Sequence, residues 1–535
     1  MPQADLIIAN ARALTADPAS PQAEAVAVRG DRIVYVGSSG GALELRGERT
    51  RVVDAAGATL LPGIIDSHYH LLRGSLKLEG VALGEAATFA DLERAVRAYA
   101  ADRPDAPWIA GYGLRYQVLA GRHPRTALDA VVPDRPVLLM AFDGHTAWAN
   151  TRALELGGLL RDGPASPSAP NSEVVRDADG LASGELREPG AFGPLAALIP
   201  PPGPAATRRL LRQGLAQAAA HGITSVHNMD GDLAQLAIYR ELEAAGELTL
   251  RVYCPYDVTP ATRAEDLAEA VEMRRVADGP LVRAGCVKFF LDGVVEGYTA
   301  LLLDEYPGRP GWRGDANFSA EHFAALATEC DRLGLQIFVH AVGDAAVRRA
   351  LDGFAAARAA NGPRDSRHRI EHIELLHPSD APRFRELGVI ASMQPYHAPV
   401  PPDYGPVWLE RAGRERWRHS FAWCDLREAG ARLAFGSDWP VVSQSPLLGL
   451  HAAVARQPWA AELPAQALPL ADALAAYTRD AAYAEFQERE KGALREGMLA
   501  DLALLDRDLA ALPPAEIASA RVAMTVCGGR VVYEA

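Results

Sequence analysis

Two histidines one residue apart close an apolar run near the start of the chain, in the segment GIIDSHYH (63–70). On a β-strand, side chains alternate between the two faces, so His68 and His70 point the same way and Tyr69 points the opposite way. Neutral imidazole nitrogens are common ligands of transition metals, so the two rings form a ready pair of metal ligands. Two unrelated histidines at a strand end would give the same short pattern, so the pair alone does not distinguish a metal site from two structural histidines.

Further candidate ligands stand near the ends of other apolar runs: Lys288, His340, His372 and Asp438. In a barrel of parallel strands, catalytic residues gather at the carboxyl ends of the strands. A single histidine at any one of these places is adequately explained as an ordinary structural side chain. Nitrogen and oxygen ligands at several strand ends together favour a metal site.

The elements that must position these residues are eight apolar runs rich in Val, Ile and Phe, separated by long segments of helical character. Strands alternating with helices are typical of a parallel barrel, so we predict an α/β fold of the (β/α)8 class. The runs predicted as barrel strands are 64–70, 223–229, 250–256, 286–292, 335–341, 368–374, 389–395 and 433–439.

Two additions to the barrel are predicted. Residues 71 to about 205 are too many for a loop, so they should form an inserted subdomain that acts as a lid. Alternating runs at 23–37 and 522–535 predict hairpins, and because isolated hairpins are marginal in water, both chain ends should pair in one small β-domain. The predicted boundaries are 1–60 with 490–535 for the β-domain and 61–489 for the barrel with its insertion.

Composition excludes several classes of protein. The formal net charge of -14 argues against a nucleic-acid binder. The five cysteines are scattered without a CxxC pair, so they suggest neither a disulfide framework nor a thiolate metal site. We find no secretory signal and no apolar run of about 20 residues that could span a bilayer. We therefore expect a cytoplasmic protein that acts on a small molecule, without a membrane partner, and that forms a homodimer.

The motifs LLPGIIDSHYH, VKFFLDG, HRIEHIE and AFGSDWPV resemble those of the amidohydrolase superfamily, and more closely its YtcJ-like branch, amidohydrolase family 3. The resemblance covers nearly the whole chain. It implies a barrel with a composite β-domain and a divalent metal centre, usually zinc, inside the barrel mouth. Manganese, iron or cobalt would also suit a set of histidines and carboxylates.

The resemblance also implies a ligand set. One ion would be held by His68, His70 and Asp438, and a second by His340 and His372, with a carboxylated Lys288 bridging the two. The bridge has an alternative, in which an unmodified Lys288 pairs with a carboxylate such as Asp292 and the protein works with one metal.

The chemistry follows from these ligands. A metal lowers the pKa of bound water and polarises a substrate carbonyl, while Asp438 would take the proton from the attacking water and return it to the leaving nitrogen. We therefore predict hydrolysis of an amide-type carbon-nitrogen bond in a small organic molecule. Decarboxylation or isomerisation in the same metal site is the second interpretation, and a metal-poor homologue without catalysis is the third.

Other polar and aromatic residues are candidates for substrate contacts. In the insertion, His145 is expected to be catalytic, as a hydrogen-bond donor to the substrate or oxyanion, or else a turn residue beside Gly144. Gln394 is expected in the pocket, whereas His397 could lie outside it, and His227 should lie behind the metal ligands. The remaining predicted substrate contacts are Asp143 and Trp148 in the insertion and Asp292, Tyr298 and Trp312 after the fourth barrel strand.

Overall fold

A computed structural model of the chain describes residues 3–142, 144–161, 172–277, 279–398 and 405–535. Asp143, one of the predicted substrate contacts, lies outside the described residues. Among the helices described, none is both long enough and apolar enough to cross a membrane.

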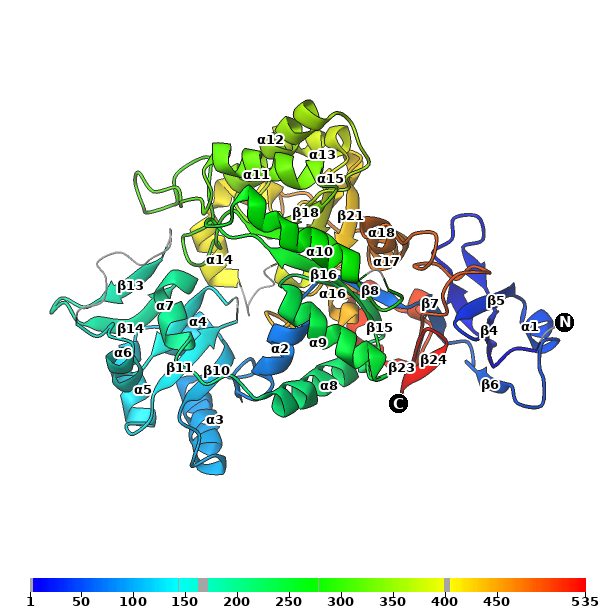
Figure 1. Cartoon of the computed structure of the whole chain (residues 1–535), viewed down its shortest axis with the longest axis horizontal. Coiled ribbons are helices and arrows are strands. Elements are labelled where there is room, and N and C mark those ends of the chain that lie inside the picture. The colour runs from blue at the N-terminus through cyan, green and yellow to red at the C-terminus, as the bar shows by residue number, and fades with distance from the viewer. Residues whose placement is uncertain (1–2, 143, 162–171, 278, 399–404) are drawn as a thin grey trace.

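The centre of the molecule is an eight-stranded parallel sheet in the order β21-β20-β19-β18-β17-β16-β15-β8, which confirms the predicted barrel (Figure 1). A parallel bridge between Tyr69 and Trp439 joins the end of β8 to the segment that follows β21. The strands are β8 (Ile64–Tyr69), β15 (Ile223–Asn228), β16 (Arg251–Asp257), β17 (Val282–Phe290), β18 (Gln336–Ala341), β19 (Arg369–His372), β20 (Ile390–Met393) and β21 (Arg432–Phe435).

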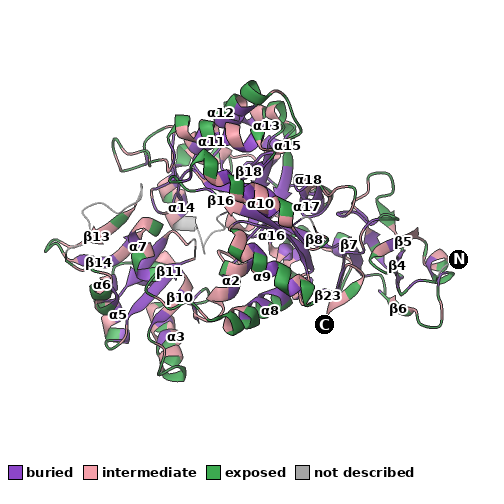
Figure 2. Cartoon of the chain, in the orientation of Figure 1, coloured by how far each residue is buried: buried purple, intermediate pink, exposed green. Residues whose placement is uncertain are grey.

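Helices cover the outside of the barrel, and their outward faces are exposed while the strands they cover are buried (Figure 2). Every residue of β18 is buried, as expected for a strand that is covered on both faces. Ser319 caps the start of α11 (Ala320–Arg332) by accepting a hydrogen bond from the His322 amide, an ordinary N-cap. The barrel helices include α2 (Leu71–Lys77), α8 (Pro204–Ala220), α9 (Leu233–Ala244), α10 (Ala268–Val276), α11 (Ala320–Arg332), α12 (Asp344–Asn361), α13 (Ala381–Leu387), α15 (Trp423–Glu428), α16 (Pro446–Val454), α17 (Leu470–Ala476) and α18 (Arg479–Ala484).

The segment between β8 and β15 contains a second sheet with its own apolar core, at the left in Figure 1. Its six strands run in the order β13-β14-β12-β11-β10-β9. They are β9 (Val81–Ala82), β10 (Ile109–Leu114), β11 (Val137–Ala141), β12 (Thr146–Ala149), β13 (Glu173–Arg176) and β14 (Ala182–Arg187), accompanied by α3 (Phe89–Asp102), α4 (Tyr116–Leu119), α5 (Pro124–Val131), α6 (Thr151–Leu156) and α7 (Pro189–Ala196).

Strands from both chain ends lie together on the side of the barrel opposite the insertion (Figure 1). One sheet has the order β5-β4-β1-β6 and the other β24-β23-β22-β7-β2-β3, in which β7 pairs antiparallel with β22. A Cβ atom on Gly529 would lie 1.8 Å from the Gly30 carbonyl oxygen, so the turns of the two terminal hairpins touch. These strands are β1 (Leu6–Ala9), β2 (Arg12–Leu14), β3 (Gln22–Ala23), β4 (Ala25–Arg29), β5 (Arg32–Gly37), β6 (Arg51–Asp54), β7 (Thr59–Pro62), β22 (Leu502–Leu505), β23 (Val522–Cys527) and β24 (Arg530–Glu534).

Candidate metal centre

A pocket of about 430 Å³ lies at the carboxyl ends of the barrel strands. Residues of the insertion and of the loops after the strands complete its walls. Five of the six predicted metal ligands line this pocket: His68, His70, His340, His372 and Asp438.

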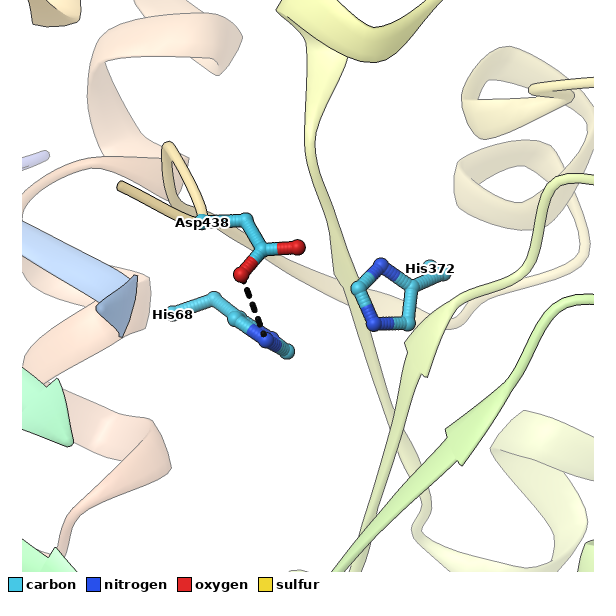
Figure 3. Close-up of side chains that lie close together, drawn as sticks. All are labelled: His68, His372 and Asp438. Atoms are coloured by element: carbon cyan, nitrogen blue, oxygen red, sulfur yellow. Dashed lines mark ion pairs between the residues drawn. The ribbon is translucent and has the colours of Figure 1, made fainter. Parts of the chain in front are cut away.

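Three of these side chains form a compact group of ligand atoms. One atom each from His68, His372 and Asp438 lies within 4.8 Å of the others. Figure 3 shows His68 beside the Asp438 carboxylate and His372 across from them. Asp438 Oδ1 is 3.4 Å from His68 Nε2 and 3.2 Å from His70 Nε2, so both members of the pair in GIIDSHYH face the same carboxylate. The alternation predicted for the first strand therefore places both rings on the site.

Two of the candidate ligands have unusual backbone conformations. The φ angle is +74° at His372 and +60° at Asp438, a region that residues other than glycine rarely adopt. In a regular strand His372 would point away from the side chain of Glu371, yet both approach His68. The turn at the end of β19 thus brings His372 into the mouth of the barrel, at a cost in backbone strain that is common at functional sites.

Carboxylates behind the histidines fix the orientation of two rings. Glu371 Oε2 lies 2.8 Å from His68 Nδ1, and Asp230 Oδ1 lies 2.5 Å from His70 Nδ1. In each case the other ring nitrogen, Nε2, faces Asp438. Glu371 is fully buried and also accepts two hydrogen bonds from Arg369, at 2.9 and 3.0 Å. Such a carboxylate behind a histidine is the usual support of a metal ligand.

Burial keeps three of the histidines in the form that binds metals. Burial and the charge of Lys288 lower the pKa of His68 to about 4. Burial, with smaller contributions from neighbouring cationic groups, holds the pKa of His340 and of His372 well below its ordinary value. All three imidazoles are therefore neutral at pH 7, as metal ligation requires.

The pKa values of the remaining two ligands, Asp438 and His70, shift in opposite directions. Burial disfavours the ionised form of Asp438, but the His68 and His70 rings outweigh it and hold the pKa of Asp438 well below its usual range. Burial also disfavours the charged form of His70, but the hydrogen bonds with Asp230 and Asp438 outweigh burial and raise the pKa of His70 above its ordinary value. Neutral imidazoles beside an ionised carboxylate fit a divalent transition metal.

His340 and Lys288 lie next to this group. The His340 ring is 4.5 Å from the His372 ring, centroid to centroid, and its Nε2 lies 3.0 Å from the Gly293 carbonyl oxygen. Lys288 is buried, with Nζ 3.7 Å from Met229 Sδ and 4.7 Å from the centre of the Phe290 ring. Burial lowers the pKa of Lys288 to about 8, so part of its amine is neutral near pH 7.

The predicted substrate contacts are divided between the pocket and its surroundings. His145 and Asp292 line the pocket, and the Asp292 carboxylate accepts hydrogen bonds from three loop amides. Trp148 is 2% exposed and packs in the core of the insertion, against Tyr116. The described part of the pocket wall does not include Trp148, Tyr298, Trp312 or Gln394.

Tyr298 and Trp312 instead stabilise the loop after β17, because the Trp312 indole N–H donates to the Tyr298 carbonyl oxygen at 2.8 Å. Gln394 is buried and is not among the described residues that line the pocket, whereas His397 lines it, with Nε2 3.9 Å from Asp438 Oδ2. His227 contacts Arg369, which in turn holds Glu371, so it lies behind His68 as expected.

Sequence reasoning missed several acidic residues of the site. Glu188 comes from the insertion and Glu374 from the segment after β19, and both line the pocket. Asp230 and Glu371 support the histidines from behind. Glu371 could have been found, since Arg369 and Glu371 lie two residues apart on a buried strand, where side chains two apart share one face. Nothing in the order of the sequence places Glu188 near a barrel histidine.

Comparisons with known proteins agree with this geometry. Protein LONG AFTER FAR-RED 3 of Arabidopsis thaliana is 30% identical to this chain, covering 99% of it and 92% of the relative. Putative amidohydrolase YtcJ of Bacillus subtilis (strain 168) is 28% identical over 91% of each chain. N-substituted formamide deformylase of Arthrobacter pascens is 28% identical over 99% of this chain and 98% of its own.

Two solved structures share the fold over almost their whole length. An uncharacterized metal-dependent hydrolase from Pyrococcus horikoshii OT3 superposes with a TM-score of 0.73 at 26% identity, covering 95% of this chain and 98% of that one. Its counterpart from Pyrococcus furiosus gives 0.71 at 25% identity, covering 95% and 99%. Residues 51–533 match the Amidohydrolase family. The chain therefore belongs to the amidohydrolase family, which confirms its resemblance to family 3 and the YtcJ-like branch.

Proposed function

We propose that this protein is a metal-dependent hydrolase that cleaves an amide-type carbon-nitrogen bond of a small organic substrate. The observation that carries the proposal is the convergence of His68, His372 and Asp438 on one pocket, in a chain of the amidohydrolase family. The metal-dependent hydrolases that share the fold and the deformylase relative support the same reaction class.

A divalent metal, for which we propose zinc, would be held by histidines of the pocket and Asp438 and would supply a Lewis acid that activates water and polarises the substrate carbonyl. Asp438 accepts the proton of the attacking water at a carboxylate oxygen and delivers it to the leaving nitrogen. One carbon-oxygen bond forms and the carbon-nitrogen bond breaks, giving a carboxylic acid and an amine.

The pocket walls favour a substrate with an apolar group. The aromatic residues Phe142, Phe290 and Tyr396 line the pocket. Aromatic and aliphatic wall residues beside polar groups that orient the ligand are typical of sites for small organic molecules. Since one relative is a deformylase of N-substituted formamides, we propose N-formyl or other N-acyl amines with an apolar N-substituent.

The test is a panel of such compounds with metal-replete protein, with acid and amine both quantified. We expect one acid and one amine for each substrate consumed, and loss of turnover in Asp438→Asn. Asp331→Asn is a matched control, because Asp331 is a buried carboxylate that is not among the described residues lining the pocket. Release of carbon dioxide or of an isomer in place of acid and amine would favour the non-hydrolytic alternative.

A further inference from the structure

Glu188 has an environment that the proposed chemistry does not explain. It follows β14 of the insertion, is 6% exposed and lines the pocket. Its φ angle of +62° is strained for a residue with a side chain. A buried carboxylate in a strained backbone needs compensating contacts, and these contacts identify what it does.

The side chain of Glu188 joins two parts of the chain that are far apart in sequence. Its Oε2 lies 2.8 Å from His145 Nδ1, and its backbone N–H donates to the His145 carbonyl oxygen at 2.7 Å. Its Oε1 accepts a hydrogen bond from Thr299 Oγ1 at 2.5 Å. His145 belongs to the insertion and Thr299 to the loop after β17, so one carboxylate binds both.

The barrel loop that Glu188 contacts also reaches the candidate metal centre. A Cβ atom on Gly293 would lie 2.5 Å from Glu188 Oε1, so this close approach requires glycine there. The Gly293 carbonyl oxygen lies 3.0 Å from His340 Nε2. The ring centres of His145 and His340 are 5.6 Å apart. The contacts of Glu188 therefore converge on the edge of the metal centre.

We propose that Glu188 is a positioning residue that clasps the insertion to the barrel and holds His145 in one orientation and one tautomer toward the substrate. The inference rests on the proposed function. A carboxylate that accepts a hydrogen bond from Nδ1 fixes the ring and directs its chemistry through Nε2. Thr299 holds the second carboxylate oxygen, so the ring, the carboxylate and the barrel loop form one rigid unit.

Kinetics test whether Glu188 acts through His145. Glu188→Gln keeps the size of the side chain but replaces one acceptor by a donor, and a catalytic group displaced by about 1 Å costs about 100-fold in rate. We expect kcat to fall about 10- to 100-fold with unchanged metal content, and by no more than about twofold when His145 is already alanine. Glu185→Gln, on β14 three residues before Glu188 and paired with Arg187, should retain wild-type kinetics.

The proposal is overturned if Glu188→Gln has wild-type kcat, or if its full loss persists in the His145→Ala background. Thr299→Val removes the hydroxyl donor while keeping the shape, so it should lower kcat, and Thr299→Ser should restore it. A structural role alone would not give this dependence on His145 together with the rescue by serine.

Hydrogen exchange tests the clasp without any substrate. Residues 144–149 and 293–301 should exchange faster in Glu188→Gln and Thr299→Val than in the wild type, and at the wild-type rate in Thr299→Ser and Glu185→Gln. Because the measurement needs no turnover, it remains decisive if no N-acyl compound is hydrolysed. Unchanged exchange of both segments in Glu188→Gln overturns the clasp whatever the reaction of the enzyme.

Discussion

Replacing Glu371 by Gln should weaken metal binding without changing any residue that lines the pocket. The Glu371 carboxylate is fully buried between His68 Nδ1, at 2.8 Å, and the guanidinium of Arg369. A glutamine side chain has a single acceptor oxygen. It can satisfy either the histidine or the arginine, and its amide group is left facing a second donor.

The magnitude follows from those contacts. Loss of one charge-assisted hydrogen bond costs about 1.5–3 kcal/mol. Carboxylates that orient a ligating histidine typically contribute about 10- to 100-fold in metal affinity, which is the same range of free energy. We therefore expect the dissociation constant for the metal to rise about 10- to 100-fold in Glu371→Gln, together with lower stability because Arg369 loses its counter-charge.

Competition with a chromophoric chelator measures this affinity directly. Asp331→Asn is the control, because Asp331 is a buried carboxylate that contacts a histidine, His368, and an arginine, Arg364, outside the pocket. The control should lose stability and keep wild-type metal affinity. Equal weakening in both variants, or wild-type affinity in Glu371→Gln, would refute the role assigned to Glu371.

Four further outcomes are expected. Asp438→Asn should retain much of the metal and lose hydrolysis, and near-normal turnover would remove Asp438 from proton transfer. Lys288→Ala should lose activity and part of the metal, with partial rescue by propionate if the lysine carries a carbamate; an unmodified lysine in a crystal structure grown with bicarbonate would contradict the bridge. Asp501→Ala should destabilise the protein by about 3–5 kcal/mol in urea unfolding, since it leaves the buried Arg251 unpaired across the interface between the barrel and the β-domain. Because the pKa of His68 falls to about 4 from an ordinary 6.5, the unfolded chain binds more protons than the folded chain between these pH values. The metal-free protein should therefore lose stability as the pH falls from 6.5 to 4, and His68→Asn should lose it less steeply. A stability that does not change with pH in this range would contradict the prediction.

The barrel and most candidate ligands could be predicted because their signals are local. Buried parallel strands are continuous apolar runs, and a polar residue at the end of such a run stands out. The spacing of His68 and His70 also predicts that both side chains point to the same face, since side chains alternate between the two faces along a strand.

The parts of the site that could not be predicted depend on tertiary contacts. The φ angle at His372 turns its side chain into the mouth, and no local pattern indicates that turn. Glu188 approaches His145 because the insertion folds its own sheet, in which Thr146 pairs with Arg187. Trp148 is expected to contact substrate because it lies beside His145 in the predicted lid, but the pairing of β12 places it in an apolar core.

The metal content of the purified protein tests the central claim most directly. After growth in zinc and dialysis against metal-free buffer, elemental analysis should find at least one divalent metal per wild-type chain. The double variant His68→Ala, His372→Ala removes two of the three ligands that lie within 4.8 Å of one another and should retain far less than one. A wild-type chain with far less than one metal, or a double variant that binds as much as the wild type, would contradict a metal centre at this pocket.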